Sequence, residues 1–150
     1  VGAIPPIIAW TAAGGSIFSE GIILVAVFFF IGQIPHFWLL LLLFGKQYAL
    51  AGLPSLNQLF SESQIKRITY TWVLTTVAAA LLVIFFVLTS QIIIVILLFY
   101  TFFLLASLSV SMFLKKDLKV RPAFYQLNFF YLFMMIFIIA DSLLREGVIS

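Results

Sequence analysis

The chain lacks most of the residues from which soluble catalytic sites are built. It has no cysteine, one histidine, and only 9% charged residues among 150. Disulfides, thiol chemistry and cysteine-based metal sites are therefore excluded, and no metal site is expected at His36 because no second histidine exists to share it. The sequence also contains no phosphate-binding glycine loop, no Ser-His-Asp set and no paired carboxylates.

Hydrophobic residues take the place of the missing charge. They make up 65% of the chain, and the mean hydropathy is +1.27. A membrane-spanning helix needs about 20 apolar residues. Four runs satisfy this length, and a shorter fifth run with two prolines and two glycines precedes them. The sequence therefore predicts one all-α transmembrane domain over residues 1–150, a polytopic helical bundle of about five spans. The expected spans are about 3–18, 21–44, 68–88, 91–113 and 124–144.

The basic residues predict the orientation of these spans. They gather in two clusters, one over 46–67 and one over 115–121, and the intervening connections carry no cation. Loops rich in Lys and Arg remain cytoplasmic. The N-terminus is thus expected inside and the C-terminus outside, in a bacterial inner membrane, with the lipid bilayer as the chain's surroundings. Because the clusters lie between apolar runs, the net charge of +3 does not indicate nucleic-acid binding.

Polar side chains inside the second run mark a candidate interior site. Gln33 and His36 lie three residues apart, so they share one face of a helix. Pro35 between them lacks an N–H and should bend the helix there. We expect either a cavity lined by these side chains or a packing hydrogen bond between helices, with the cavity favoured. In the last run Asn128 and Tyr131 share one face of a helix. That spacing is equally compatible with side chains that border the same cavity and with plain packing.

The segment 45–67 is expected to be a polar loop that caps the site on the cytoplasmic side. Lys46, Lys66 and Arg67 are suited to bind a diphosphate, although simple positive-inside anchoring is the favoured interpretation. Ser61 followed by Gln64 resembles a helix entry. Near the other end of the chain, Asp141 lies four residues before Arg145, and an ion pair on the helix surface is expected.

Several strings in the chain resemble one family. They are Gly-Ala-Ile-Pro-Pro at 2–6 followed by Trp10, Gln-Ile-Pro-His-Phe-Trp at 33–38, Tyr-Ala-Leu-Ala-Gly-Leu-Pro at 48–54, and Phe-Phe-Tyr-Leu-Phe at 129–133 with Asp141. Their order and spacing resemble the protoheme IX farnesyltransferases (heme O synthases) of the UbiA superfamily of intramembrane prenyltransferases. The resemblance implies that the chain corresponds to helices five to nine of a nine-helix enzyme, its C-terminal half.

The resemblance also implies a reaction and a set of ligands. Members join a farnesyl group from a prenyl diphosphate to heme b, which is a substrate and not a cofactor. Their Mg²⁺ is held by two acidic motifs, and the second places Asp directly before the tyrosine that corresponds to Tyr48. Gln47 stands at that position here, so the acidic ligands of Mg²⁺ are absent from this chain.

The sequence therefore predicts an intramembrane prenyltransferase-like protein. It would transfer a farnesyl-type group from a diphosphate donor to heme b or another hydrophobic acceptor. We expect it to be inactive alone and to act only as part of a larger or split enzyme; in the split case, another chain would supply the N-terminal half. The resemblance assigns Gln33, His36, Trp38, Asn128 and Tyr131 to the acceptor chamber. It assigns Lys46, Gln47, Tyr48, Lys66 and Arg67 to the diphosphate. The alternative is a noncatalytic membrane scaffold or assembly subunit derived from the family.

Overall fold

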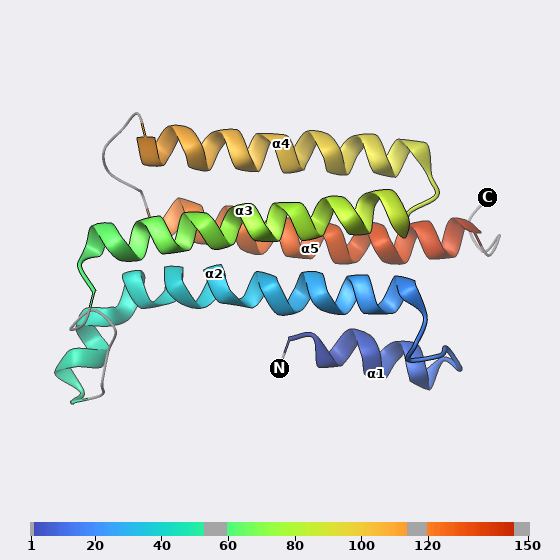
Figure 1. The fold of residues 1–150 in the computed structure, drawn as a ribbon, viewed down its shortest axis with the longest axis horizontal. Helices are drawn as coiled ribbons and strands as arrows, with labels where there is room; N and C mark the ends of the chain where they lie inside the picture. The colour runs from blue at the N-terminus through green and yellow to red at the C-terminus, as the bar shows by residue number, and fades with distance from the viewer. Residues whose placement is uncertain (1, 53–59, 114–119, 146–150) are drawn as a thin grey trace.

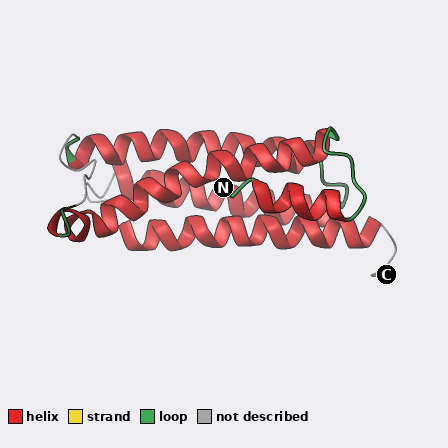
Figure 2. Cartoon of the chain, turned by 90° about the horizontal axis from the view of Figure 1, so that it is seen from below, coloured by secondary structure: helices red, strands yellow, loops and turns green. Residues whose placement is uncertain are grey.

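The fold, in a computed structural model, is a bundle of helices. The structure describes residues 2–52, 60–113 and 120–145. Within these ranges every regular element is a helix: α1 (Ile4–Ala12), α2 (Glu20–Leu50), α3 (Glu62–Phe86), α4 (Gln91–Phe113) and α5 (Val120–Arg145). Figure 1 shows the four long helices running side by side along the molecule, and Figure 2 shows the same bundle from below. The all-α prediction is confirmed.

Four of the helices are long and apolar enough to cross a membrane. The candidate spans within them are Glu20–Gly45, Ser63–Phe86, Gln91–Ser111 and Val120–Arg145. The first predicted span, about 3–18, contains α1, which has nine residues. At 1.5 Å per residue this helix is only about 14 Å long, less than half of a ~30 Å hydrocarbon core. It packs against α2.

The predicted loop at 45–67 is wrong at both of its ends. The helix α2 continues through 46–50, and α3 already begins at Glu62. The residues that follow Gly45 are mostly good helix formers, so one glycine does not end α2. At the start of α3, Ser61 and Gln64 form a capping box, in which the side chain of each accepts a hydrogen bond from the backbone N–H of the other. The helix entry predicted at Ser61 is confirmed.

The long helices enclose a continuous apolar core. Phe28 of α2 and Phe130 of α5 are fully buried, and their rings meet edge to face with centroids 6.0 Å apart. Leu97 of α4 and Ile84 of α3 complete the centre of this cluster. The helix α2 packs against both α3 and α5, and α4 packs against the far side of the same two helices. This arrangement places one face of α2 and one face of α5 next to each other along the bundle.

Most threonines in the spans satisfy their hydroxyl groups locally. Thr69, Thr76 and Thr101 each donate to the backbone carbonyl four residues earlier, at 2.7–2.8 Å. A hydroxyl in a lipid environment has no water to bind, so this local bond removes most of the cost of burying it. These threonines are therefore compatible with membrane-spanning helices and do not themselves indicate a polar channel.

The expected surface ion pair of Asp141 with Arg145 is also wrong. Asp141 is only 2% exposed, and its carboxylate accepts hydrogen bonds from the backbone N–H groups of Thr89 and Ser90 and from the Thr89 hydroxyl. Thr89 and Ser90 directly precede α4, whose first backbone N–H groups have no partner within the helix. A negative charge at this position also interacts favourably with the helix dipole. Asp141 thus attaches the end of α5 to the beginning of α4.

Replacement of Asp141 by alanine should destabilise the bundle. The change leaves two part-buried N–H groups without their acceptor, at a cost of about 1 kcal/mol. Thermal unfolding of the purified protein in detergent measures the effect. The matched control is Arg145→Ala, which should change the unfolding temperature little. A comparable loss in both variants would instead support the ion pair.

Candidate functional site

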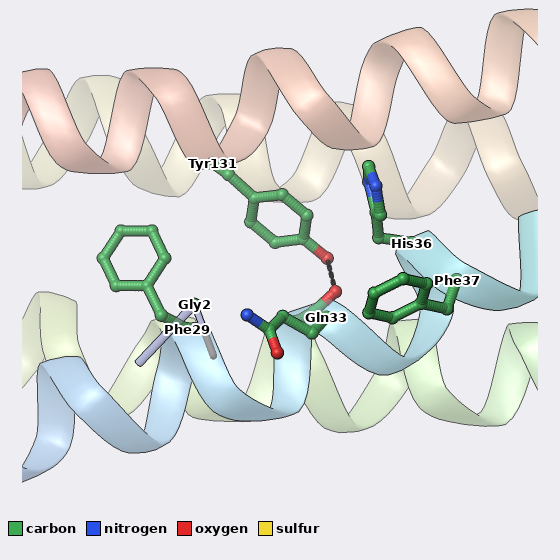
Figure 3. Close-up of a pocket in the computed structure, with 7 residues that line it drawn as sticks. Gly2, Phe29, Gln33, His36, Phe37 and Tyr131 are labelled. Carbon is green, nitrogen blue, oxygen red and sulfur yellow. Dashed lines mark hydrogen bonds between the residues drawn. The ribbon is translucent and has the colours of Figure 1, made fainter. Parts of the chain in front are cut away.

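A pocket lies between α2 and α5, near the middle of the candidate span of α2. Its volume is about 240 Å³. Figure 3 shows its lining side chains, which come from α2 and α5, with the backbone of the N-terminal segment beside them. The lining residues are Gly2, Phe29, Gly32, Gln33, His36, Phe37 and Tyr131. Three predicted residues, Gln33, His36 and Tyr131, are therefore brought together around one hollow.

The hydroxyl of Tyr131 joins the two helices at this pocket. It donates to the backbone carbonyl of Gly32 at 2.7 Å, as the dashed line in Figure 3 shows. The close approach needs glycine: a Cβ atom at position 32 would lie 2.7 Å from the tyrosine ring. Pro35 follows one turn later and leaves the carbonyl of Ile31 without its normal helical donor. The polar face of α2 thus includes backbone as well as side chains.

His36 forms a second polar contact between the same helices. Its Nδ1 lies 3.0 Å from the side-chain oxygen of Asn128, whose amide nitrogen donates to the carbonyl of Phe124 at 2.8 Å. That second bond assigns the orientation of the amide, so the oxygen faces the imidazole. Because an amide oxygen only accepts, a neutral His36 carries its proton on Nδ1 and has a lone pair on Nε2. Asn128, predicted to border the cavity, acts through His36 and is not in the pocket lining.

Gln33 has a different environment from His36. Its side chain lies against the backbone of Gly2, where a Cβ atom would overlap with it. Its amide makes no hydrogen bond to the described residues, although it lines the pocket. An amide offers two donors and one acceptor. Gln33 therefore provides hydrogen-bonding capacity to a molecule in the pocket.

The structure does not bring the remaining predicted residues to this pocket. Trp38 is half-buried on another face of α2, with its ring centroid 6.4 Å from that of Phe60. Gln47 and Tyr48 are exposed in the last turns of α2. These turns begin 11 residues beyond His36, about 16 Å along a helix. Figure 1 shows this end of α2 turning away from the line of the bundle.

The cations of α3 lie at the same end of the molecule as the end of α2. Lys66 is half-buried beside a small hollow that Tyr70 and Thr69 also line, and Arg67 is exposed. The side chain of Lys46 lies outside the described part of the structure. The predicted diphosphate residues and the predicted chamber residues thus occupy different heights in the bundle.

The predicted site residues did not include two aromatic residues and two glycines of the lining, one of them Gly32. Phe29 and Phe37 are four residues before and after Gln33, so helical spacing alone places them on its face. Gly2 carries no such signal, because its position follows from how α1 folds back along α2.

The residues around the pocket do not fit a bound Mg²⁺. This ion takes oxygen ligands, chiefly carboxylates. The pocket lining contains no carboxylate, and no three His, Asp or Glu side chains gather anywhere in the described ranges. Asp141, the buried carboxylate described above, lies near the C-terminal end of α5 and already accepts hydrogen bonds from three donor groups.

Part of the chain is similar to known enzymes named protoheme IX farnesyltransferase. The relative from Azorhizobium caulinodans is 54% identical over 55 residues, which is 37% of this chain and 18% of that protein. The relative from Geobacter sulfurreducens is 49% identical over 53 residues, 35% of this chain and 20% of that protein. The relative from Rhodopseudomonas palustris strain HaA2 is 42% identical over 78 residues, 51% of this chain and 25% of that protein.

These similarities support a relationship to prenyltransferases over part of the chain. The chain spans a quarter or less of the length of these relatives. No family model matches it, and no solved structure matches it. The relationship agrees with the four long apolar helices of the fold.

Replacement of Gly32 by alanine should separate α2 from α5. The added methyl group would collide with the ring of Tyr131, and overpacking of this kind costs about 1–3 kcal/mol. Thermal unfolding in detergent should show the loss. The matched control is Gly21→Ala in the same helix, where the nearest atom to a new Cβ is a Val87 methyl at 4.0 Å. Equal effects of the two variants would contradict the proposed close packing.

Proposed function

We propose that this chain is part of an intramembrane prenyltransferase of the protoheme IX farnesyltransferase type. It would transfer a farnesyl-type group from a prenyl diphosphate to heme b or to another hydrophobic acceptor. The observation that carries the proposal is the pocket between α2 and α5, because it presents imidazole, amide and phenol groups in the middle of an apolar span. Polar side chains at such depth are costly unless they serve packing or a bound molecule. The partial similarity to named protoheme IX farnesyltransferases supports the same reaction class.

The distribution of charge supports two separate sites along the bundle, one for the acceptor and one for the diphosphate. The allylic cation that forms when diphosphate leaves must be kept away from water, and the aromatic pocket offers such an environment. The leaving diphosphate needs cations at the water-facing end. Lys66 and Arg67 lie there, with Lys46, Gln47 and Tyr48 on the adjacent end of α2. The reacting prenyl carbon is bonded to the diphosphate, so the reacting edge of the acceptor has to approach this end.

The size of the pocket supports a site that is shared with another part of the enzyme. Pockets for drug-sized ligands usually measure about 300–1,000 Å³, which is more than the 240 Å³ found here. A porphyrin would therefore extend beyond the described pocket. We propose that an N-terminal half, carried by the same polypeptide or by another chain, completes the chamber and contributes the acidic ligands of Mg²⁺.

Reconstitution tests this function. The chain is combined with the N-terminal part of the Azorhizobium caulinodans relative in lipid vesicles, with heme b, farnesyl diphosphate and Mg²⁺. Heme O is measured by chromatography and mass spectrometry, and each component alone is the control. We expect product only from the combination. Absence of heme O, with both parts folded and associated, would remove the transferase proposal for this acceptor and favour the noncatalytic scaffold.

Arg67 provides a test of the diphosphate end. In the reconstituted system, Arg67→Ala should raise the KM for farnesyl diphosphate roughly tenfold, because a charge-assisted hydrogen bond contributes about 1.5–3 kcal/mol. Arg67→Lys should have a smaller effect, since lysine keeps the charge but loses the bidentate geometry. Arg145→Ala, at the opposite end of the bundle, is the matched control and should leave KM unchanged. An unchanged KM in Arg67→Ala would argue that this residue serves only membrane orientation.

A further inference from the structure

The helix α1 is weakly attached to the rest of the bundle. It has nine residues, none of them buried, and it packs against α2. The hydrogen bonds of its side chains end within residues 7–16, and in the described ranges no hydrogen bond joins α1 to another helix. Segments with few buried contacts open locally at a low cost in free energy. If one helix moves away from the bundle, α1 therefore loses the least.

The segment before α1 covers one end of the pocket. Gly2 belongs to the pocket lining and lies against the side chain of Gln33, as Figure 3 shows. The approach is so close that a Cβ atom at position 2 would overlap with the Gln33 amide. That amide makes no hydrogen bond to the described residues, so it loses no partner when Gly2 moves away. The pocket would then extend past Gln33, while its other end, at Phe37, is already open.

The turn that follows α1 sets the direction in which α1 lies. Gly14 has a φ of +87°, and the N–H of Gly15 donates to the carbonyl of Trp10 at 3.0 Å. The indole N–H of Trp10 donates to the carbonyl of Ser16 at 2.9 Å, and the indole ring occupies the space in which a side chain at position 15 would lie. Gly2 precedes Trp10 by about 12 Å of helix. A small rotation at this turn is therefore amplified into a larger displacement of Gly2.

Two prolines lower the cost of moving the start of α1 into lipid. The first N–H groups of a helix have no acceptor within the helix, and each of them is costly when it is exposed to hydrocarbon. Pro5 and Pro6 lie in the first turn of α1 and carry no N–H. The Gly-Ala-Ile-Pro-Pro string followed by Trp10 thus combines a residue without a side chain over the pocket, a helix start with few donors, and a hydrogen bond at the turn.

We propose that residues 2–16 form a hinged cover over the Gln33 end of the pocket, and that the Trp10–Ser16 hydrogen bond keeps this cover closed. In the closed form, which the structure shows, the pocket measures about 240 Å³ and ends at Gly2. In the open form α1 rotates about Gly14 and Gly15, and the pocket accepts a longer apolar molecule. The inference concerns the motion of α1 and does not depend on the reaction proposed above.

Distances between two spin labels test the motion. The chain has no cysteine, so labels attach only at introduced cysteines. Ile8→Cys in α1 and Val95→Cys in α4 place both labels on the surface of the bundle, because these side chains are 60% and 65% exposed. Pulsed electron paramagnetic resonance on the whole chain in lipid vesicles gives the distribution of distances between the labels. We expect one major distance, from the closed cover, and a minor population at a different distance, from the open cover.

Substitutions at the turn should change the size of the minor population. Trp10→Phe removes the N–H donor but keeps an aromatic ring, and the open fraction should rise roughly 2–10-fold, as expected for the loss of one neutral hydrogen bond. Gly15→Ala should act in the same direction, because its methyl group would displace the indole. In a Trp10→Ala background, Gly15→Ala should add little, since the ring that it displaces is absent. The matched control is Trp72→Phe in α3, which should leave the distances unchanged because the Trp72 indole makes no hydrogen bond to the described residues.

A disulfide gives a second measurement of the closed form. A Cβ atom at position 2 would lie 3.2 Å from the Cγ atom of Gln33, so the Cβ atoms of the two residues come close to the separation of about 3.5–4.5 Å that a disulfide requires. The double variant Gly2→Cys with Gln33→Cys should therefore form this bond under mild oxidation, as detected by mass spectrometry. Addition of Gly15→Ala should slow its formation.

The outcomes separate this inference from the transferase proposal. The same distances in the natural chain, Trp10→Phe and Gly15→Ala, with equal helix content by circular dichroism, would overturn the cover. Failure of the folded cysteine pair to form a disulfide would also overturn it, because the segment would then not lie over Gln33. An equal change in Trp72→Phe would point to a general loosening of the bundle and would overturn the role of the Trp10–Ser16 bond. Each of these results is independent of whether heme O forms in the reconstituted system.

Discussion

The contact between α2 and α5 is the interaction on which the pocket depends. Two polar groups of α5 reach α2, the Tyr131 hydroxyl to a backbone carbonyl and the Asn128 amide to an imidazole. In hydrocarbon these groups have no water as an alternative partner, so each has to be satisfied by the protein. A single bond of this kind contributes about 1 kcal/mol. Two of them, one turn apart on α5, also fix how the helices are rotated about their own axes.

Backbone features of α2 make that contact possible. Gly32 has no side chain to hold the tyrosine ring away, and Pro35 removes one donor from the same region of the helix. The residues that form the pocket are therefore not separable into structural and functional sets. Gly32 positions Tyr131, Tyr131 holds α5 beside α2, and the position of α5 brings Asn128 to His36.

The sequence predicted the helices well because membrane spans follow from length and hydropathy within single segments. It favoured a cavity at Gln33 and His36 because helical spacing and the proline made α2 a candidate wall, and it left Tyr131 open between that cavity and plain packing. The prediction from sequence failed where the hydrogen-bond partner of a residue is distant in the sequence. Asp141 was paired with the nearest cation on its own helix, whereas its partners lie about 50 residues away at Thr89 and Ser90. Trp38 was assigned to the chamber with His36 from the resemblance, but two residues along a helix rotate a side chain by about 200°.

What surrounds the pocket leaves one of its sides open. The buried rings of Phe28 and Phe130 close the side toward the core, and Gly2 covers Gln33. Phe37, 61% exposed, borders the open side one residue beyond His36. Under the proposed function, the acceptor would enter from this side. The candidate diphosphate residues lie at a different height in the bundle, so the reaction requires an acceptor long enough to reach from the pocket toward them.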